Sequence, residues 1–98
     1  MALRIDPEQN EVLALQRITD WHRKNVLEIG CGEGRLTQRL VQLGAIVHAI
    51  DPDARLVRKA RARLPQDFKK SVRYKTGQAE RLAHADRSFD VVVFAWSL

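Results

Sequence analysis

Three glycines at alternate positions directly follow a short apolar segment that carries an acid near its end. Glu28 lies two residues before Gly30, and Gly32 and Gly34 complete a turn that leads into a predicted helix. Glycine permits backbone angles closed to other residues and lets a ligand approach the main chain without meeting a Cβ atom. The amides that open the next helix would point at that ligand. We therefore expect a ligand-binding turn, with Cys31 between its first two glycines.

Two classes of ligand use such a turn, namely dinucleotides and S-adenosylmethionine. The dinucleotide fingerprint is G-x-G-x-x-G, with a pyrophosphate at the helix N-terminus. Here the spacing is G-x-G-x-G, and Arg35 stands where the third glycine of that fingerprint would be. Glu28 would repel a diphosphate but would suit a ligand that carries an ammonium and a sulfonium. Spacing and charge favour S-adenosylmethionine over a nicotinamide cofactor, while a turn that uses its glycines for packing alone is the structural alternative.

A second acid follows the next apolar segment at a distance that suits the same ligand. Asp51 ends residues 45–50 and lies 21 residues after Gly30, close to the spacing of about 20 that a ribose contact requires. A carboxylate there can accept hydrogen bonds from both ribose hydroxyls. The alternative is that Asp51 caps the following helix, but Asp53, just after Pro52, fits that cap better. We therefore expect Asp51 to be free for the ribose.

The segment from Glu28 to Gly34 resembles the first motif of the class I S-adenosylmethionine-dependent methyltransferases, most closely the small-molecule group often called type 11. The resemblance implies that the glycine turn wraps the methionine part of the cofactor and that the acid organises its amino group, directly or through water. Residues 74–82 are similar to the family's G-D-A-E-x-L segment, and residues 86–98 to its S-F-D-x-V strand, whose end leads to the reacting methyl group. The implied cofactor contacts are Glu28, Gly30, Cys31, Gly32, Gly34, Asp51, Pro52, Gln78, Ala79 and Phe94.

One of these positions departs from the family pattern. In the family an acid meets the adenine amino group and the next backbone amide meets a ring nitrogen, whereas this chain has Gln78 followed by Ala79. The Gln78 carbonyl can still accept from the adenine amine, so a neutral hydrogen bond replaces a charge-assisted one. A plain surface turn is the alternative interpretation of Gln78.

The elements that must position these residues alternate between strand and helix. Helical periodicity predicts helices over residues 6–21, 35–43 and 54–64, and short apolar segments predict strands over 25–29, 45–50, 72–76 and 90–95. Right-handed crossovers then give one α/β domain, residues 1–98, with a Rossmann-like parallel sheet in the order 3-2-1-4 and three αβα layers. The resemblance covers only the first half of the family's domain, so strands 5–7 and the acceptor-binding part are expected to be absent.

This incomplete sheet predicts an exposed edge and a bare face at the strand over residues 90–95. We expect either a fragment of a longer methyltransferase or a homodimer in which this strand pairs about a twofold axis. A noncatalytic cofactor-binding or scaffolding half-domain is the alternative to an enzyme, because no catalytic base is identifiable and the methyl acceptor, most simply a small molecule, is unknown.

Charge and composition limit the remaining possibilities. The net charge is +5, and basic residues gather over residues 55–75. RNA is a possible partner, although solvated helix faces commonly carry such residues. The three histidines and the single cysteine show no metal-ligand spacing, so neither a metal site nor a nucleophilic thiol is expected. No secretory or membrane-spanning segment is apparent, which predicts a cytoplasmic protein. The basic residues of that stretch are Arg55, Arg58, Lys59, Arg61, Arg63, Lys69, Lys70, Arg73 and Lys75.

Overall fold

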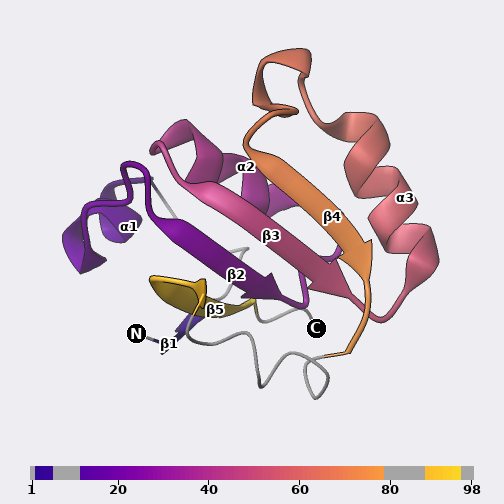
Figure 1. Cartoon of the computed structure of the whole chain (residues 1–98), viewed down its shortest axis with the longest axis horizontal. Coiled ribbons are helices and arrows are strands. Elements are labelled where there is room, and N and C mark those ends of the chain that lie inside the picture. The colour runs from indigo at the N-terminus through magenta and orange to yellow at the C-terminus, as the bar shows by residue number, and fades with distance from the viewer. Residues whose placement is uncertain (1, 6–11, 79–87, 96–98) are drawn as a thin grey trace.

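The computed structural model of the chain describes residues 2–5, 12–78 and 88–95, and it shows an α/β fold (Figure 1). Strands and helices alternate as the sequence predicts. In chain order the elements are β1 (Ala2–Ile5), α1 (Val12–Ile18), β2 (Asn25–Ile29), α2 (Arg35–Gln42), β3 (Ile46–Asp51), α3 (Ala54–Arg63), the 3-10 helix η1 (Gln66–Phe68), β4 (Val72–Thr76) and β5 (Val91–Ala95).

The sheet has five strands in the order β1-β5-β2-β3-β4, and every neighbouring pair is parallel. The four predicted strands are β2, β3, β4 and β5, so their predicted order 3-2-1-4 is confirmed. From β2 the chain continues to β3 and β4 on one side, and it then returns to add β5 on the other side of β2. The switch point of the sheet therefore lies between β2 and β5. In open α/β sheets ligands bind beyond the carboxyl ends of the strands at such a switch point.

Strand β1 was not predicted, and it overturns the expectation of an exposed edge at β5. Ala2 to Ile5 pair in parallel with Val92 to Ala95, so β5 lies between β1 and β2. Four residues are too few for a period to show, and their partner strand lies at the other end of the sequence. The twofold pairing through the edge of β5 that the sequence suggested would require β1 to leave.

The helices differ little from prediction where the structure describes them. Helix α1 ends at Ile18, a few residues before the predicted end near Trp21, and its predicted start at Asp6 and Pro7 lies outside the described residues. Helix α3 begins after its cap at Asp53 and ends before Pro65, as predicted. None of the helices in the described part of the chain has the length and apolarity needed to cross a membrane.

One face of the sheet packs against the helices. Alternate residues of β2, β3, β4 and β5 point to that face, as the pleat requires, and join a single apolar cluster with α2 and α3. The cluster also includes Leu15 of α1 and the buried Trp21. Each fully buried leucine there contributes about 1.5–3 kcal/mol by leaving water. The crossover from β4 to β5, which would form the third layer on the other face, lies mostly in residues 79–87, outside the described residues.

Candidate cofactor site

The three glycines of the turn between β2 and α2 all adopt positive φ angles, but they do so in different surroundings. A Cβ at Gly30 would lie 3.0 Å from the carbonyl oxygen of Ala95, and one at Gly34 would lie 3.3 Å from the Cβ of Ala60 and against the Tyr74 hydroxyl. A Cβ at Gly32 would meet nothing within 4 Å. Gly30 and Gly34 therefore allow the chain to pack on itself, whereas Gly32 leaves open space where a ligand can approach the backbone.

The turn is tied to the end of β3 by its own backbone. The amides of Gly30 and Cys31 donate to the carbonyl of Ile50 at 2.9 and 3.0 Å. The amide of Gly34 donates to the carbonyl of Cys31 at 2.9 Å, and Gly34 occupies the N-cap position of α2 without a side-chain cap. These bonds place the turn beside Asp51.

Asp51 already accepts two hydrogen bonds from the main chain, which the sequence did not predict. Its side chain is 5% exposed; Oδ2 accepts from the amide of Gly32 at 3.0 Å, and Oδ1 accepts from the amide of Asp53 at 2.9 Å. A carboxylate oxygen has two lone pairs, so each oxygen keeps the capacity to accept another donor. Asp53, as predicted, caps α3 by accepting from the amide of Arg55 at 2.9 Å. Asp51 therefore holds the glycine turn and the start of α3 together.

Glu28 lies beneath the turn and is completely buried. Thr37 of α2 donates its hydroxyl to Oε1, while Oε2 has no hydrogen-bond partner among the described residues. Burial raises the pKa of Glu28 to about 8, opposed by the Thr37 hydrogen bond and assisted by the nearby charge of Asp51. An unpartnered buried oxygen costs about 1–3 kcal/mol, and a donor from a cationic ligand or from water would remove that cost. The orphaned oxygen fits the amino group of S-adenosylmethionine.

Two residues of this buried polar group, Thr37 and Tyr74, were missed by sequence reasoning. The Tyr74 hydroxyl is buried without a hydrogen-bond partner among the described residues, and burial raises its pKa to about 12. Tyr74 lies at an inward position of β4, and that alternation was the available signal. Cys31 is also buried, and burial raises the pKa of its thiol far above the usual range.

The residues expected on the adenine side of the cofactor lie just beyond Asp51. Pro52, Thr76, Gly77 and Gln78 line a hollow of about 230 Å³. The Gly77 amide donates to the Asp51 carbonyl at 3.1 Å, which brings the end of β4 next to the end of β3. Gln78 is exposed and Ala79 lies outside the described residues. The structure therefore brings Pro52 and Gln78 together.

Phe94 lies near the carboxyl end of β5, beside the glycine turn. It lies opposite Ile29 in the sheet and is 38% exposed. The contact between Gly30 and the Ala95 carbonyl places the end of β5 against the glycine turn.

The described part of the chain contains no group of three or more residues suited to hold a metal ion. His48 instead packs edge-on against Phe89, with ring centroids 5.2 Å apart.

The family model that matches the chain is described as a methyltransferase domain and covers residues 26–98. An uncharacterized methyltransferase of Mycobacterium tuberculosis is 39% identical over 72 residues, which are 74% of this chain and 28% of that protein. The ubiquinone biosynthesis O-methyltransferase of Agrobacterium fabrum is 37% identical over 68 residues, which are 69% of this chain and 27% of that protein. The chain thus spans little more than a quarter of the length of these relatives.

Solved structures agree with the sequence relatives. A putative S-adenosylmethionine-dependent methyltransferase from Listeria monocytogenes superposes with a TM-score of 0.72 at 26% identity, over 88% of this chain and 40% of that one. Phosphoethanolamine N-methyltransferase 1 from Haemonchus contortus, in complex with phosphoethanolamine and S-adenosylhomocysteine, gives a TM-score of 0.71 at 27% identity, over 86% of this chain and 18% of that one. The glycine turn, the parallel strand order and the family match together show that the chain belongs to the class I S-adenosylmethionine-dependent methyltransferases and contains part of their domain.

Proposed function

We propose that this chain binds S-adenosylmethionine at the carboxyl edge of its sheet and forms the cofactor-binding part of a methyltransferase for a small-molecule acceptor. The observation that carries this proposal is the hydrogen bond from the Gly32 amide to the Asp51 carboxylate at 3.0 Å. That bond joins the glycine turn to Asp51, the carboxylate proposed to bind the ribose, and the space above Gly32 is open.

Each part of the cofactor has a matching group in this unit. The uncapped N-terminus of α2 suits the methionine carboxylate, and the orphaned Oε2 of Glu28 suits the amino group, through water where the turn lies between them. Asp51 retains acceptor capacity for ribose hydroxyls. The hollow at Pro52 and Gln78 suits the adenine, and Phe94 offers an apolar surface at the end of β5.

The bound cofactor would supply a methyl group activated by a sulfonium centre. The chain's own residues would hold and orient it, and orientation of this kind is a major contribution to transfer between two bound molecules. Glu28 is too deeply buried to act on an acceptor, and Asp51 is engaged by two amides. The names of two relatives refer to transfer to oxygen and to nitrogen, so both kinds of acceptor atom are candidates.

A calorimetric titration of S-adenosylhomocysteine into the purified chain tests the proposal. We expect micromolar binding that weakens about tenfold, or by about 1.4 kcal/mol, in Asp51→Ala and several-fold in Gln78→Ala. Gln78 is exposed, so its variant tests the site without endangering the fold. Asp67→Ala, which removes another acid from exposed η1, is the matched control and should bind like the wild type.

The same titration separates the rival functions. Binding of reduced nicotinamide dinucleotide in place of S-adenosylhomocysteine would indicate an oxidoreductase. A folded chain that binds no S-adenosylhomocysteine would contradict the proposal. Incubation with labelled S-adenosylmethionine and a mixture of small-molecule acceptors then tests transfer. Binding without any transfer would identify a noncatalytic cofactor-binding module.

We infer a second candidate function, binding of RNA, from a hollow of about 870 Å³ along β4. Its walls include Arg61, Lys69, Arg73 and Lys75, and Phe89 offers an aromatic ring for stacking. None of the ion pairs in the described part of the chain involves these four basic residues. Phosphate contacts make affinity fall steeply with salt. Fluorescence anisotropy with a single-stranded RNA should show that fall and a loss in the Arg73→Gln/Lys75→Gln variant, and no affinity at low salt would remove this candidate.

A further inference from the structure

A further polar hollow lies between α2 and the end of α3, next to the glycine turn to which Glu33 belongs. It has a volume of about 270 Å³ and is formed mainly by the surface of α2, with Glu33 and the last residue of α3 at one side. Arginine and glutamine side chains dominate its lining. The residues concerned are Glu33, Arg35, Gln38, Arg39, Gln42 and Arg63.

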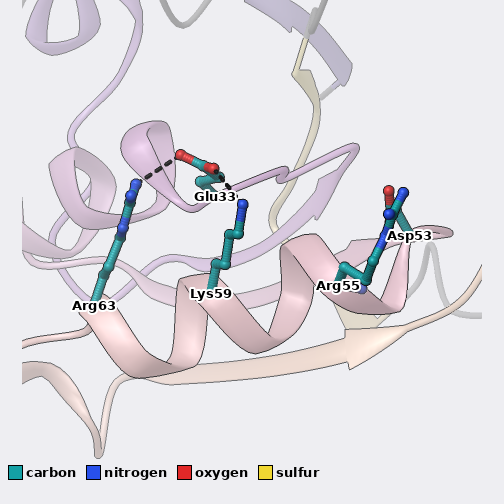
Figure 2. A network of polar contacts seen from close by, with 5 residues as sticks. All are labelled: Glu33, Asp53, Arg55, Lys59 and Arg63. Atoms are coloured by element: carbon teal, nitrogen blue, oxygen red, sulfur yellow. Dashed lines mark hydrogen bonds and ion pairs between the residues drawn. The ribbon is translucent and has the colours of Figure 1, made fainter.

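The acid in this hollow is already neutralised. Arg63 Nη1 lies 2.6 Å from Glu33 Oε2, and Lys59 Nζ lies 3.7 Å from Glu33 Oε1. Figure 2 shows the Glu33 carboxylate held between these two side chains of α3. Gln38 supports the same arrangement by donating its amide to the carbonyl of Arg63 at 3.3 Å. These contacts fix one wall of the hollow. The two cations, Lys59 and Arg63, outnumber the single carboxylate of Glu33, so this wall carries a net positive charge.

The arginines of the other wall have no counterion among the described residues. Neither Arg35 nor Arg39 takes part in an ion pair there, and Nη1 of Arg39 is buried without a hydrogen-bond partner among those residues. A guanidinium does not lose its charge at any physiological pH. A guanidinium without a counterion is stabilised by an oxyanion beside it, and the side chains of Arg35 and Arg39 both line the hollow.

We propose that this hollow is a binding site for a phosphate group, with Arg35 and Arg39 as the principal ligands and Arg63 as the third cation. The planar guanidinium matches the oxygens of a phosphate in pairs, with charge-assisted hydrogen bonds. Gln42 adds a neutral donor at the rim. The site adjoins the cofactor site, because Arg35 is also the first residue of α2. Its lining includes none of Glu28, Asp51 and Gln78.

Titration of the ¹⁵N-labelled chain with inorganic phosphate, at constant ionic strength maintained with chloride, tests this site. Amide signals of α2 should shift and saturate in the wild type, and the affinity should fall about tenfold in Arg39→Gln. Arg58→Gln removes an equal charge from an exposed position of α3 outside the hollow, and it should bind phosphate like the wild type. A parallel titration with glycerol 3-phosphate separates a site for free phosphate from one for a phosphomonoester.

The Glu33 carboxylate would compete with a phosphate for Arg63, so its removal provides a test in which the affinity should rise. Glu33→Gln releases Lys59 and Arg63, so phosphate affinity should rise several-fold. Shifts that do not saturate, or that weaken equally in Arg39→Gln and Arg58→Gln, would show diffuse attraction to a basic surface and overturn the proposal. The spectra themselves report whether each variant is folded, and the cofactor takes no part in the experiment.

Discussion

The carboxylate of Asp51 accepts a hydrogen bond from the backbone amide of Gly32 at 3.0 Å, across 19 residues of sequence. The other carboxylate oxygen accepts from the amide of Asp53. One side chain therefore connects the turn after β2 with the turn after β3. Any change at Asp51 acts on the fold as well as on a ligand, and the two effects have to be measured separately.

Substitution of Asp51 should lower the free energy of unfolding in a graded way. Asp51→Ala leaves two backbone amides without their acceptor and should cost about 1–3 kcal/mol. Asp51→Asn keeps one acceptor oxygen and should cost less. Urea denaturation followed by circular dichroism measures both, with Asp67→Asn as the control. Equal stability of Asp51→Ala and the wild type would show that the bridge does not support the fold.

The turn glycines should respond differently to the same substitution. Gly30→Ala brings a Cβ to 3.0 Å from the Ala95 carbonyl, in addition to the strain of its positive φ. Gly32→Ala meets nothing within 4 Å, so only the backbone strain of about 1–2 kcal/mol remains.

We therefore expect Gly30→Ala to be the less stable variant in urea. Gly32→Ala should remain folded, while its affinity for S-adenosylhomocysteine falls about tenfold because the new methyl group occupies the ligand's approach. Calorimetry on the folded Gly32→Ala variant is the decisive measurement. Unchanged affinity would show that the open space at Gly32 is not part of the cofactor site.

Glu28 should make the fold less stable as the pH rises. Its pKa is about 8 in the folded chain against 4.5 as the ordinary value, so the folded state binds the proton more tightly than the unfolded state. The resulting stability is fully present below pH 4.5 and is lost progressively as the pH rises to about 8. Glu28→Gln resembles the protonated acid and should flatten this dependence. Urea midpoints of both proteins, measured between pH 5 and about 9, give the comparison. A slope that is the same in both would contradict the assignment to Glu28.

Removal of β1 should convert a covered edge into an exposed one. A chain that begins at residue 6 leaves β5 paired only with β2, and unpaired strand edges promote association. We expect this shortened chain to form concentration-dependent dimers or larger species in sedimentation velocity, more strongly than the full chain does. Identical sedimentation of the two would show that β1 does not protect this edge, and dimers of the full chain would have to form elsewhere.

The sequence is sufficient to predict the parallel sheet and to name candidate site residues, for reasons that particular residues show. Apolar strands such as Val26 to Ile29 and the cap at Asp53 are local features, and local patterns report them. Strand β1 escaped prediction because it pairs with β5 at the far end of the chain, and local patterns do not report such a distant pairing.

The site shows the same division between local and distant causes. The position of Asp51 was predictable from its spacing, but its bond to Gly32 depends on how two turns meet in space. Thr37 and Tyr74 were missed because each resembles an ordinary core residue in its own element. Only the packing of α2 and β4 around Glu28 gives them a shared environment.

The different surroundings of the three glycines have a consequence for how such motifs change in evolution. At Gly30 and Gly34 a side chain would collide with other parts of the chain, so any descendant that keeps this fold is under selection to keep both glycines. At Gly32 the constraints are the positive backbone angle and the open space that a ligand would use. Asparagine tolerates that left-handed angle better than most residues. A descendant that gave up the cofactor could replace Gly32 first, and an asparagine there between two retained glycines would be a visible record of that loss.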